Sequence, residues 1–159
     1  MSNSEESEIK DVIFKYAWAL DTRDWAALAE VFTPDARGEF SDPGYGDQDM
    51  GTILRLFQEG AETGPIRQWQ HFVTNQLITH REGDRARIKA FFTCAWRFDD
   101  HQQQPRNEVA MVGGIYENDL LRTVNGWRIA VLRATTWWDH GGKEVMPEWR
   151  YLGRGPLFG

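Results

Sequence analysis

The sequence predicts an α+β fold in which three N-terminal helices pack on a strongly curved antiparallel sheet, closing a cone-shaped barrel with one deep pocket. Apolar residues recur at helical spacing in the first third of the chain, whereas long segments of strand-like composition fill most of the rest. The connections between those segments are short, which makes neighbouring strands antiparallel. A chain of 159 residues can bury a sizeable core, so we expect one domain, residues 1–159.

The first helix is expected to begin after a capping Asn3 or Ser4 and to run to about Leu20. Glutamates in its first turn suit the positive end of the helix dipole. Five apolar residues at helical spacing form one stripe, which must face a core: Ile9, Val12, Ile13, Tyr16 and Leu20.

Two further helices are expected before the sheet. The second should end near Phe32, because residues 33–35 (Thr-Pro-Asp) are typical of a turn and a proline disfavours the helical conformation in the residue before it. Residues 37–40 then predict a short strand. Apolar residues at helical spacing from Met50 predict a short third helix that ends before Gly60.

Four long strands are expected to follow. The polar run 99–107 connects the middle two, and Asn125-Gly126 is the strongest hairpin signal in the chain. The predicted strands cover residues 67–80, 85–98, 108–123 and 127–138.

Composition and charge exclude several classes of function. A formal net charge of −6 with dispersed Lys and Arg argues against a nucleic-acid partner. No apolar stretch approaches membrane-spanning length and no secretory signal is visible, so we expect no membrane partner. Cys94 is the only cysteine, which fits a reducing, cytoplasmic compartment. Eight tryptophans and nine phenylalanines suit a small hydrophobic or aromatic substrate, although they could also fill a bulky core and an oligomer interface.

No metal and no organic cofactor is expected. Apart from His71, the histidines His80, His101 and His140 are predicted to be solvated and have no spacing typical of metal ligands. The chain also lacks a glycine-rich dinucleotide or phosphate loop. Any activity should therefore be cofactor-independent.

Asp21 stands out at the junction of the first two helices. Asp24 or Thr22 suffices to cap the second helix, so Asp21 is left at the end of a buried stripe without an obvious local partner. A carboxylate near a core is costly unless it is paired. The alternative is that Asp21 is a second capping or solvated aspartate.

His71 is the candidate partner of Asp21, because a carboxylate that orients an imidazole makes a general base near neutral pH. A histidine in mid-strand could also be a structural, hydrogen-bonded residue. Strand alternation predicts that four residues share the face of His71: Trp69, Val73, Asn75 and Leu77.

Four motifs spread over most of the chain carry a resemblance to a known family: residues 16–25, residues 31–36, Gln70-His71-Phe72 and Asn125-Gly126-Trp127-Arg128. Together they resemble the SnoaL-like branch of the nuclear-transport-factor-2-like superfamily, in pattern most like scytalone dehydratase and lindane dehydrochlorinase. This fold hosts many chemistries and also non-enzymes. The resemblance implies that Asp21 and His71 form an acid–base dyad.

The resemblance also implies a set of pocket positions, with departures from scytalone dehydratase. Leu20 and Phe40 stand where that enzyme has two tyrosines that position the departing hydroxyl, and Trp96 stands where it has a second histidine. Tyr16 and Tyr116 are the hydroxyls available instead, or are ordinary core tyrosines. The expected substrate-binding residues are Leu20, Phe40, Asn75, Phe92, Cys94, Trp96, Val112, Leu132, Thr136 and Trp138.

We therefore expect a cofactor-independent lyase, with dehydration of an aromatic or hydrophobic alcohol as the leading reaction and Asp21, His71, Tyr16 and Tyr116 as its catalytic groups. A retro-aldol carbon–carbon lyase or an isomerase could use the same dyad. A non-catalytic ligand-binding or small-subunit module is the alternative outside the enzymes. A homodimer or homotrimer is expected, since the last strand carries Trp137 on a face that would otherwise expose an apolar patch.

Overall fold

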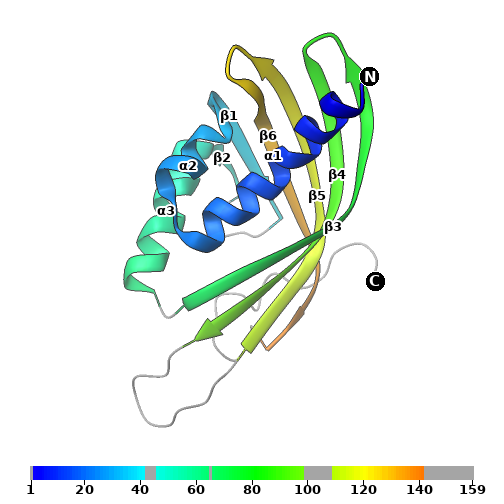
Figure 1. The fold of residues 1–159 in the computed structure, drawn as a ribbon. Coiled ribbons are helices and arrows are strands. Elements are labelled where there is room, and N and C mark those ends of the chain that lie inside the picture. The colour runs from blue at the N-terminus through cyan, green and yellow to red at the C-terminus, as the bar shows by residue number, and fades with distance from the viewer. Residues whose placement is uncertain (1, 42–45, 65, 99–108, 142–159) are drawn as a thin grey trace, which may run out of the picture.

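A computed structural model describes residues 2–41, 46–64, 66–98 and 109–141, in which three helices pack on one face of a six-stranded sheet (Figure 1). The helices are α1 (Asn3–Thr22), α2 (Trp25–Glu30) and α3 (Met50–Thr63). The strands are β1 (Phe32–Phe40), β2 (Asp47–Asp49), β3 (Ile66–Glu82), β4 (Arg85–Phe98), β5 (Val109–Thr123) and β6 (Gly126–His140). The predicted α+β class with helices on one face is confirmed.

The sheet is mixed and open. Its strand order is β2-β1-β6-β5-β4-β3, and β1 runs parallel to β6 while all other neighbours are antiparallel. Within the described residues β2 and β3 are two separate edges, so the expected all-antiparallel sheet closed into a barrel is wrong. The single deep pocket stays a prediction. The long strands bend halfway along, and α1 crosses the concave side that the bend creates (Figure 1).

Helix α1 buries the predicted stripe completely. Ser2, rather than Asn3 or Ser4, is the cap, and its Oγ accepts the backbone N–H of Glu5 at 3.2 Å. The five stripe residues Ile9, Val12, Ile13, Tyr16 and Leu20 are at most 4% exposed and form the core with the inner face of the sheet. The helix ends two residues later than expected, at Thr22.

Three local expectations between α1 and β3 are corrected by the structure. Helix α2 ends at Glu30, and β1 already begins at Phe32, so residues 33–35 lie in a strand and not in a turn. The pairing of β1 with β6 is irregular between Phe32 and Arg37, and a proline is tolerated there because no ladder hydrogen bond needs its amide. Helix α3 continues through Gly60 to Thr63, and the short strand β2 before it was not expected.

Two register shifts decide which side chains face the helices. In β3 the left-handed Asn75 (φ 54°) lies at a shift between Thr74 and Leu77. After this shift Gln76 is half-buried, whereas Asn75 and Leu77 are exposed. The expectation that these last two share the face of His71 is therefore wrong. The second shift lies in β6, where Gly114 pairs with Thr136 but Gly113 pairs with Trp138.

Candidate functional site

Hydrogen bonds join the C-terminal end of α1 to β3, and the candidate site lies at this junction. Trp69 Nε1 donates to the carbonyl oxygen of Leu20 at 2.7 Å, and the Arg23 guanidinium donates to the carbonyl oxygen of Arg67 at 2.7 Å. Arg23 also lies over the Trp69 ring, 5.6 Å from its centroid. Sequence reasoning did not anticipate this role of Arg23. The only signal was a cationic residue at a helix C-terminus, which is common.

Asp21 lies in the last turn of α1, where the junction with β3 directs its side chain toward the sheet. Asp24 caps α2 by accepting the backbone N–H of Ala27 at 3.0 Å, so Asp21 is not needed as a cap. Thr22 turns its hydroxyl back to the carbonyl oxygen of Trp18 at 2.8 Å. The carboxylate of Asp21 is therefore available to a partner on β3.

Asp21 binds His71 through both carboxylate oxygens. Oδ1 lies 2.5 Å from the ring Nδ1, and Oδ2 accepts the backbone N–H of His71 at 2.7 Å. The side chains of His71 and Asp21 are only 9% and 19% exposed. Because the backbone N–H can only donate, the carboxylate is held in one orientation, with Nδ1 as its second donor. Nε2 is then the ring nitrogen that Asp21 does not contact.

The resting dyad is an ion pair. Burial alone would lower the pKa of His71, but contacts with Cys94 and Asp21 outweigh it and raise the pKa to about 10. Cys94 is the cross-strand partner of His71 on β4 and is buried. At neutral pH the ring therefore carries a proton, whereas the sequence argument expected a base poised near neutrality.

Tyr16 and Tyr116 lie beside the dyad. They come from α1 and β5, are 1% and 3% exposed, and their ring centroids are 5.8 Å apart. The Tyr16 ring centroid is 6.4 Å from that of His71. Burial, together with the electrostatic influence of Tyr16 and Cys94 and a hydrogen bond shared with Tyr16, raises the pKa of Tyr116 well above its usual value, so its phenol stays protonated. Two buried hydroxyls and one imidazolium thus share a small region.

Most of the other expected site residues lie in the core that surrounds the two tyrosines. Phe92 stacks on Tyr116 with ring centroids 4.3 Å apart. Phe40 is half-buried and packs on Phe57 of α3, 6.1 Å between centroids. Thr136 is half-buried as well. The remaining members of this group are at most 8% exposed: Leu20, Cys94, Trp96, Val112 and Leu132.

Asn75 and Trp138 do not join this group. Asn75 is exposed because the register shift in β3 turns it outward. Trp138 is 43% exposed, and its ring lies over the Gly113 backbone, where an added Cβ would come within 2.2 Å of it. Since Val112, next to Gly113, is buried on the inner face, Trp138 lies on the opposite face. Trp137 is an additional residue in β6 between the pairs Gly114–Thr136 and Gly113–Trp138, and it shifts Trp138 to this face.

No metal site and no membrane-crossing helix is found where the structure is described. In those residues no group of three or more His, Cys, Asp or Glu side chains is arranged to hold a metal ion. No helix there combines the length and the apolar character needed to cross a membrane.

Comparison with known proteins places the chain in a family. The SnoaL-like domain model matches residues 2–133. The chain belongs to the SnoaL-like domain family. A relative is an uncharacterized protein of Mycobacterium tuberculosis (strain H37Rv), 29% identical over 128 residues, which cover 79% of this chain and 81% of that protein.

Several solved structures share the fold. A Novosphingobium aromaticivorans protein assigned as an aromatic ring hydroxylase is 25% identical, with a TM-score of 0.77 over 91% of this chain and 97% of that one. Another, assigned as a scytalone dehydratase in the same organism, is 19% identical (TM-score 0.73, 87% of each chain). A hexachlorocyclohexane dehydrochlorinase of Novosphingobium barchaimii is 14% identical (TM-score 0.69, 86% and 89%). At these last two identities the likeness shows the fold alone.

Proposed function

We propose that this SnoaL-like protein is a cofactor-independent lyase, most simply a dehydratase of an aromatic or hydrophobic alcohol. The observation that carries the proposal is the two-point contact of Asp21 with His71, 2.5 Å to Nδ1 and 2.7 Å to the backbone N–H, next to two buried phenols. The names of two structural neighbours, a dehydratase and a dehydrochlorinase, also describe eliminations. The aromatic residues around the dyad suit a substrate with an aromatic ring.

In this reaction Nε2 of the neutral His71 ring takes a proton from a carbon of the substrate. The electron pair of that C–H bond forms the new double bond, and the C–O bond breaks at the neighbouring carbon. The departing hydroxyl accepts a proton from Tyr16 or Tyr116 and leaves as water. Asp21 stabilises the imidazolium that is formed, and the phenol then regains a proton from that ring.

The raised pKa of His71 makes the first step depend on pH. Because the resting ring is protonated below a pKa of about 10, only the deprotonated fraction can act as the base. An alternative within the same site is that the imidazolium protonates the leaving hydroxyl. The two roles require opposite protonation states of His71, so the dependence of the rate on pH distinguishes them.

The test is incubation of the purified protein with a panel of aryl alcohols and diols, followed by mass analysis of the products. Loss of water supports dehydration, loss of formaldehyde indicates retro-aldol cleavage, and a new product of unchanged mass indicates isomerisation. His71→Gln is the control, since it keeps a polar side chain but cannot act as the base. The proposal is wrong if no compound reacts, or if His71→Gln forms product as fast as the unmodified protein.

A further inference from the structure

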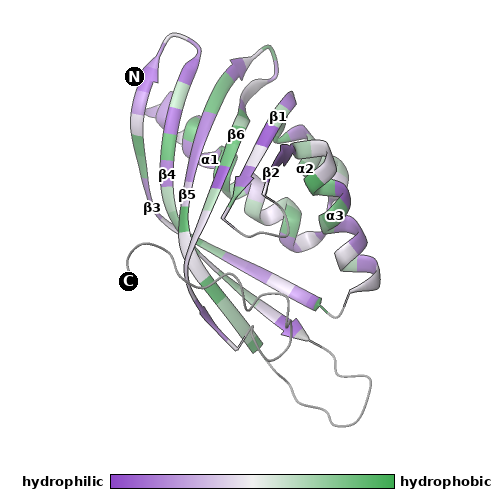
Figure 2. Ribbon diagram, turned by 180° about the vertical axis from the view of Figure 1, so that it is seen from behind, coloured by the Kyte–Doolittle hydropathy of each residue, from purple (hydrophilic) through white to green (hydrophobic). Residues whose placement is uncertain are grey.

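A groove lies between α1, α2 and the turn that joins β5 to β6. Its volume is about 570 Å³, within the range of pockets that hold small molecules. We call it the helix groove, and the residues that line it include Phe14, Trp18, Ala27, Asn125, Trp127 and Arg128. In Figure 2, which views the molecule from behind, the sheet lies in front of α1, so the helix groove faces away from the outer side of the sheet. Asp21 and His71 are not among its lining residues, so it is separate from the dyad.

Two aromatic side chains of α1 form one wall of the helix groove. Phe14 is 49% exposed and Trp18 is 75% exposed. The two residues are four positions apart, so they lie one turn apart on the same face of the helix. Large apolar side chains gathered at a groove, unlike apolar residues scattered singly, indicate a contact surface. Their rings suit a ligand that is itself flat and aromatic.

Trp127 brings a hydrogen-bond donor to the helix groove. The residue is 6% exposed, and Nε1, the one polar atom of its side chain, has no hydrogen-bond partner among the residues that the structure describes. The Arg81 guanidinium covers a face of the Trp127 ring, 4.9 Å from its centroid, and so does not use the N–H, which points outward in the plane of the ring. A buried donor without a partner costs free energy. An acceptor atom on a bound molecule would remove that cost.

Arg128 adds further donors next to Trp127. Its side chain is half-buried, and in the described part of the chain its guanidinium makes one hydrogen bond, from Nη1 to the carbonyl oxygen of Phe32 at 3.4 Å. A guanidinium has five N–H groups, so most of its donors are still available. Two neighbouring residues therefore offer donors to the same acceptor.

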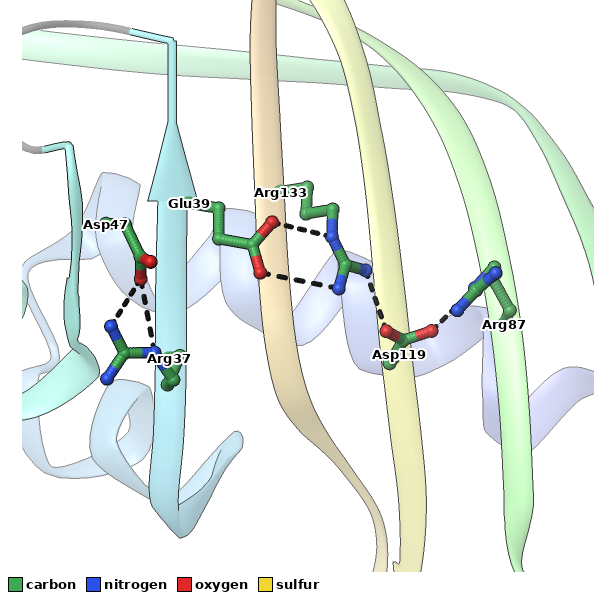
Figure 3. A network of polar contacts seen from close by, with 6 residues as sticks. All are labelled: Arg37, Glu39, Asp47, Arg87, Asp119 and Arg133. Atoms are coloured by element: carbon green, nitrogen blue, oxygen red, sulfur yellow. Dashed lines mark hydrogen bonds and ion pairs between the residues drawn. The ribbon is translucent and has the colours of Figure 1, made fainter.

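The charges around the helix groove disfavour an anion. On the outer side of the sheet, cations and anions neutralise one another, as where Arg133 donates to both Glu39 and Asp119 (Figure 3). Around the helix groove three carboxylates outnumber two cations: Asp11, Asp24 and Glu30 against Lys15 and Arg128. None of these five forms an ion pair with another described residue. An anionic ligand would meet this excess of negative charge on a chain whose net charge is already −6.

We propose that the helix groove binds an uncharged aromatic molecule that carries a carbonyl oxygen. The ring of the ligand lies against Phe14 and Trp18, and the carbonyl oxygen accepts hydrogen bonds from Trp127 Nε1 and Arg128. This is a second ligand site, and it does not depend on the chemistry of the dyad.

The test is a titration of the nitrogen-labelled full chain, followed by proton–nitrogen NMR, with three small probes. Acetophenone has the ring and the carbonyl, ethylbenzene has the same shape without the carbonyl, and benzoate is an anion of similar size. Acetophenone should bind more tightly than either of the others. It should also move the indole N–H resonance of Trp127 downfield, because a new hydrogen bond deshields the proton, whereas ethylbenzene should not. Trp127→Phe identifies this resonance by its absence.

Two comparisons among variants locate the binding. Trp127→Phe keeps an aromatic ring without the N–H, so it should weaken the binding of acetophenone by roughly three- to tenfold and leave that of ethylbenzene unchanged. Phe14→Ala should weaken the binding of both probes. Its matched control is Phe72→Ala, the same change at a 48% exposed phenylalanine of β3, which should leave both unchanged.

Circular dichroism checks that each variant keeps its fold. If Trp127→Phe does not fold, the pair Phe14→Ala and Phe72→Ala decides the outcome. Three results would overturn the proposal: acetophenone that does not bind, Phe14→Ala and Phe72→Ala that bind it equally well, or benzoate that binds more tightly than acetophenone. The second result would place the probe elsewhere, for example beside the dyad.

Discussion

One carboxylate, that of Asp21, fixes both the ring and the backbone of His71, at 2.5 Å from Nδ1 and 2.7 Å from the backbone nitrogen. The ring cannot rotate about χ1 without losing the first of these contacts, and the strand cannot shift without losing the second. Orientation of the imidazole is therefore set by where α1 ends, and not by contacts among side chains of the sheet alone.

Removing either member of the dyad should abolish most activity. Asp21→Asn keeps an acceptor for the backbone N–H but loses the charge, and His71→Ala loses the base. We expect each to lower kcat by roughly a hundredfold or more, and the double variant to be little worse than the more damaging single one. Steady-state kinetics of the three variants measure this. Nearly full activity of Asp21→Asn would show that Asp21 is not part of the catalytic unit.

The rate should depend on pH through His71. If the neutral ring is the base, kcat/KM rises with pH up to the pKa of His71, about 10. In Asp21→Asn one of the influences that raise this pKa is lost, so the rise should move to lower pH while its plateau falls. Rates measured from pH 6 upward show the profile. A rate that instead falls over this range would assign His71 the role of acid.

The same shift should make stability depend on pH. In the unfolded chain His71 releases its proton near pH 6.5, whereas in the folded protein it keeps the proton to about pH 10. Between these values the folded state binds more protons, so this contribution to stability is full below pH 6.5 and is lost as pH rises toward 10. Thermal unfolding of the unmodified protein and of His71→Gln should show a Tm difference that shrinks across this window. A difference that stays constant would contradict the raised pKa.

The buried hydroxyls can be tested with phenylalanine. Tyr116→Phe keeps the stacking on Phe92 and loses only the phenol, and Tyr16→Phe is the matched change on α1. We expect at least one of them to lower kcat by about a hundredfold with little change in KM, the pattern for a proton donor used in the transition state. Unchanged kcat in both would mean that the tyrosines only fill the core.

Activity should survive removal of metal ions. No ligand set of the usual kinds is found in the part of the chain that the structure describes. Dialysis against a strong chelator should leave kcat and KM unchanged. A rate that falls, and returns with added zinc, magnesium or manganese, would require a metal in the mechanism.

The sequence was sufficient where a local pattern determines the structure. Helical spacing identified the buried stripe of α1, and β4 has the predicted bounds, Arg85–Phe98. Local features, an aspartate without a cap to serve and a histidine in mid-strand, made Asp21 and His71 candidate partners, and the family resemblance implied their pairing, which the structure shows. Their catalytic roles remain predictions.

The errors arose where one residue or one distant contact decides the structure. The parallel pairing of β1 with β6 joins segments more than ninety residues apart, such as Phe32 and Ile129, and no local signal shows it. A shift of one residue exchanges the two faces of a strand, so alternation misplaced Asn75 and Leu77 once β3 departed from regular pairing. The irregular pairing of β6 likewise moved the expected pocket position Trp138 to the other face.

The junction of α1 with β3 makes His71 a reporter of helix docking. Three hydrogen bonds lie close together between the C-terminal end of α1 and β3: Trp69 to Leu20, Arg23 to Arg67, and His71 to Asp21. If α1 lifts from the sheet, the imidazole loses its carboxylate at the same moment, and one of the influences that raise its pKa is lost. An NMR resonance of that ring would then report detachment of the helix. Any event that loosens α1 would separate Asp21 from His71 before the sheet itself unfolds.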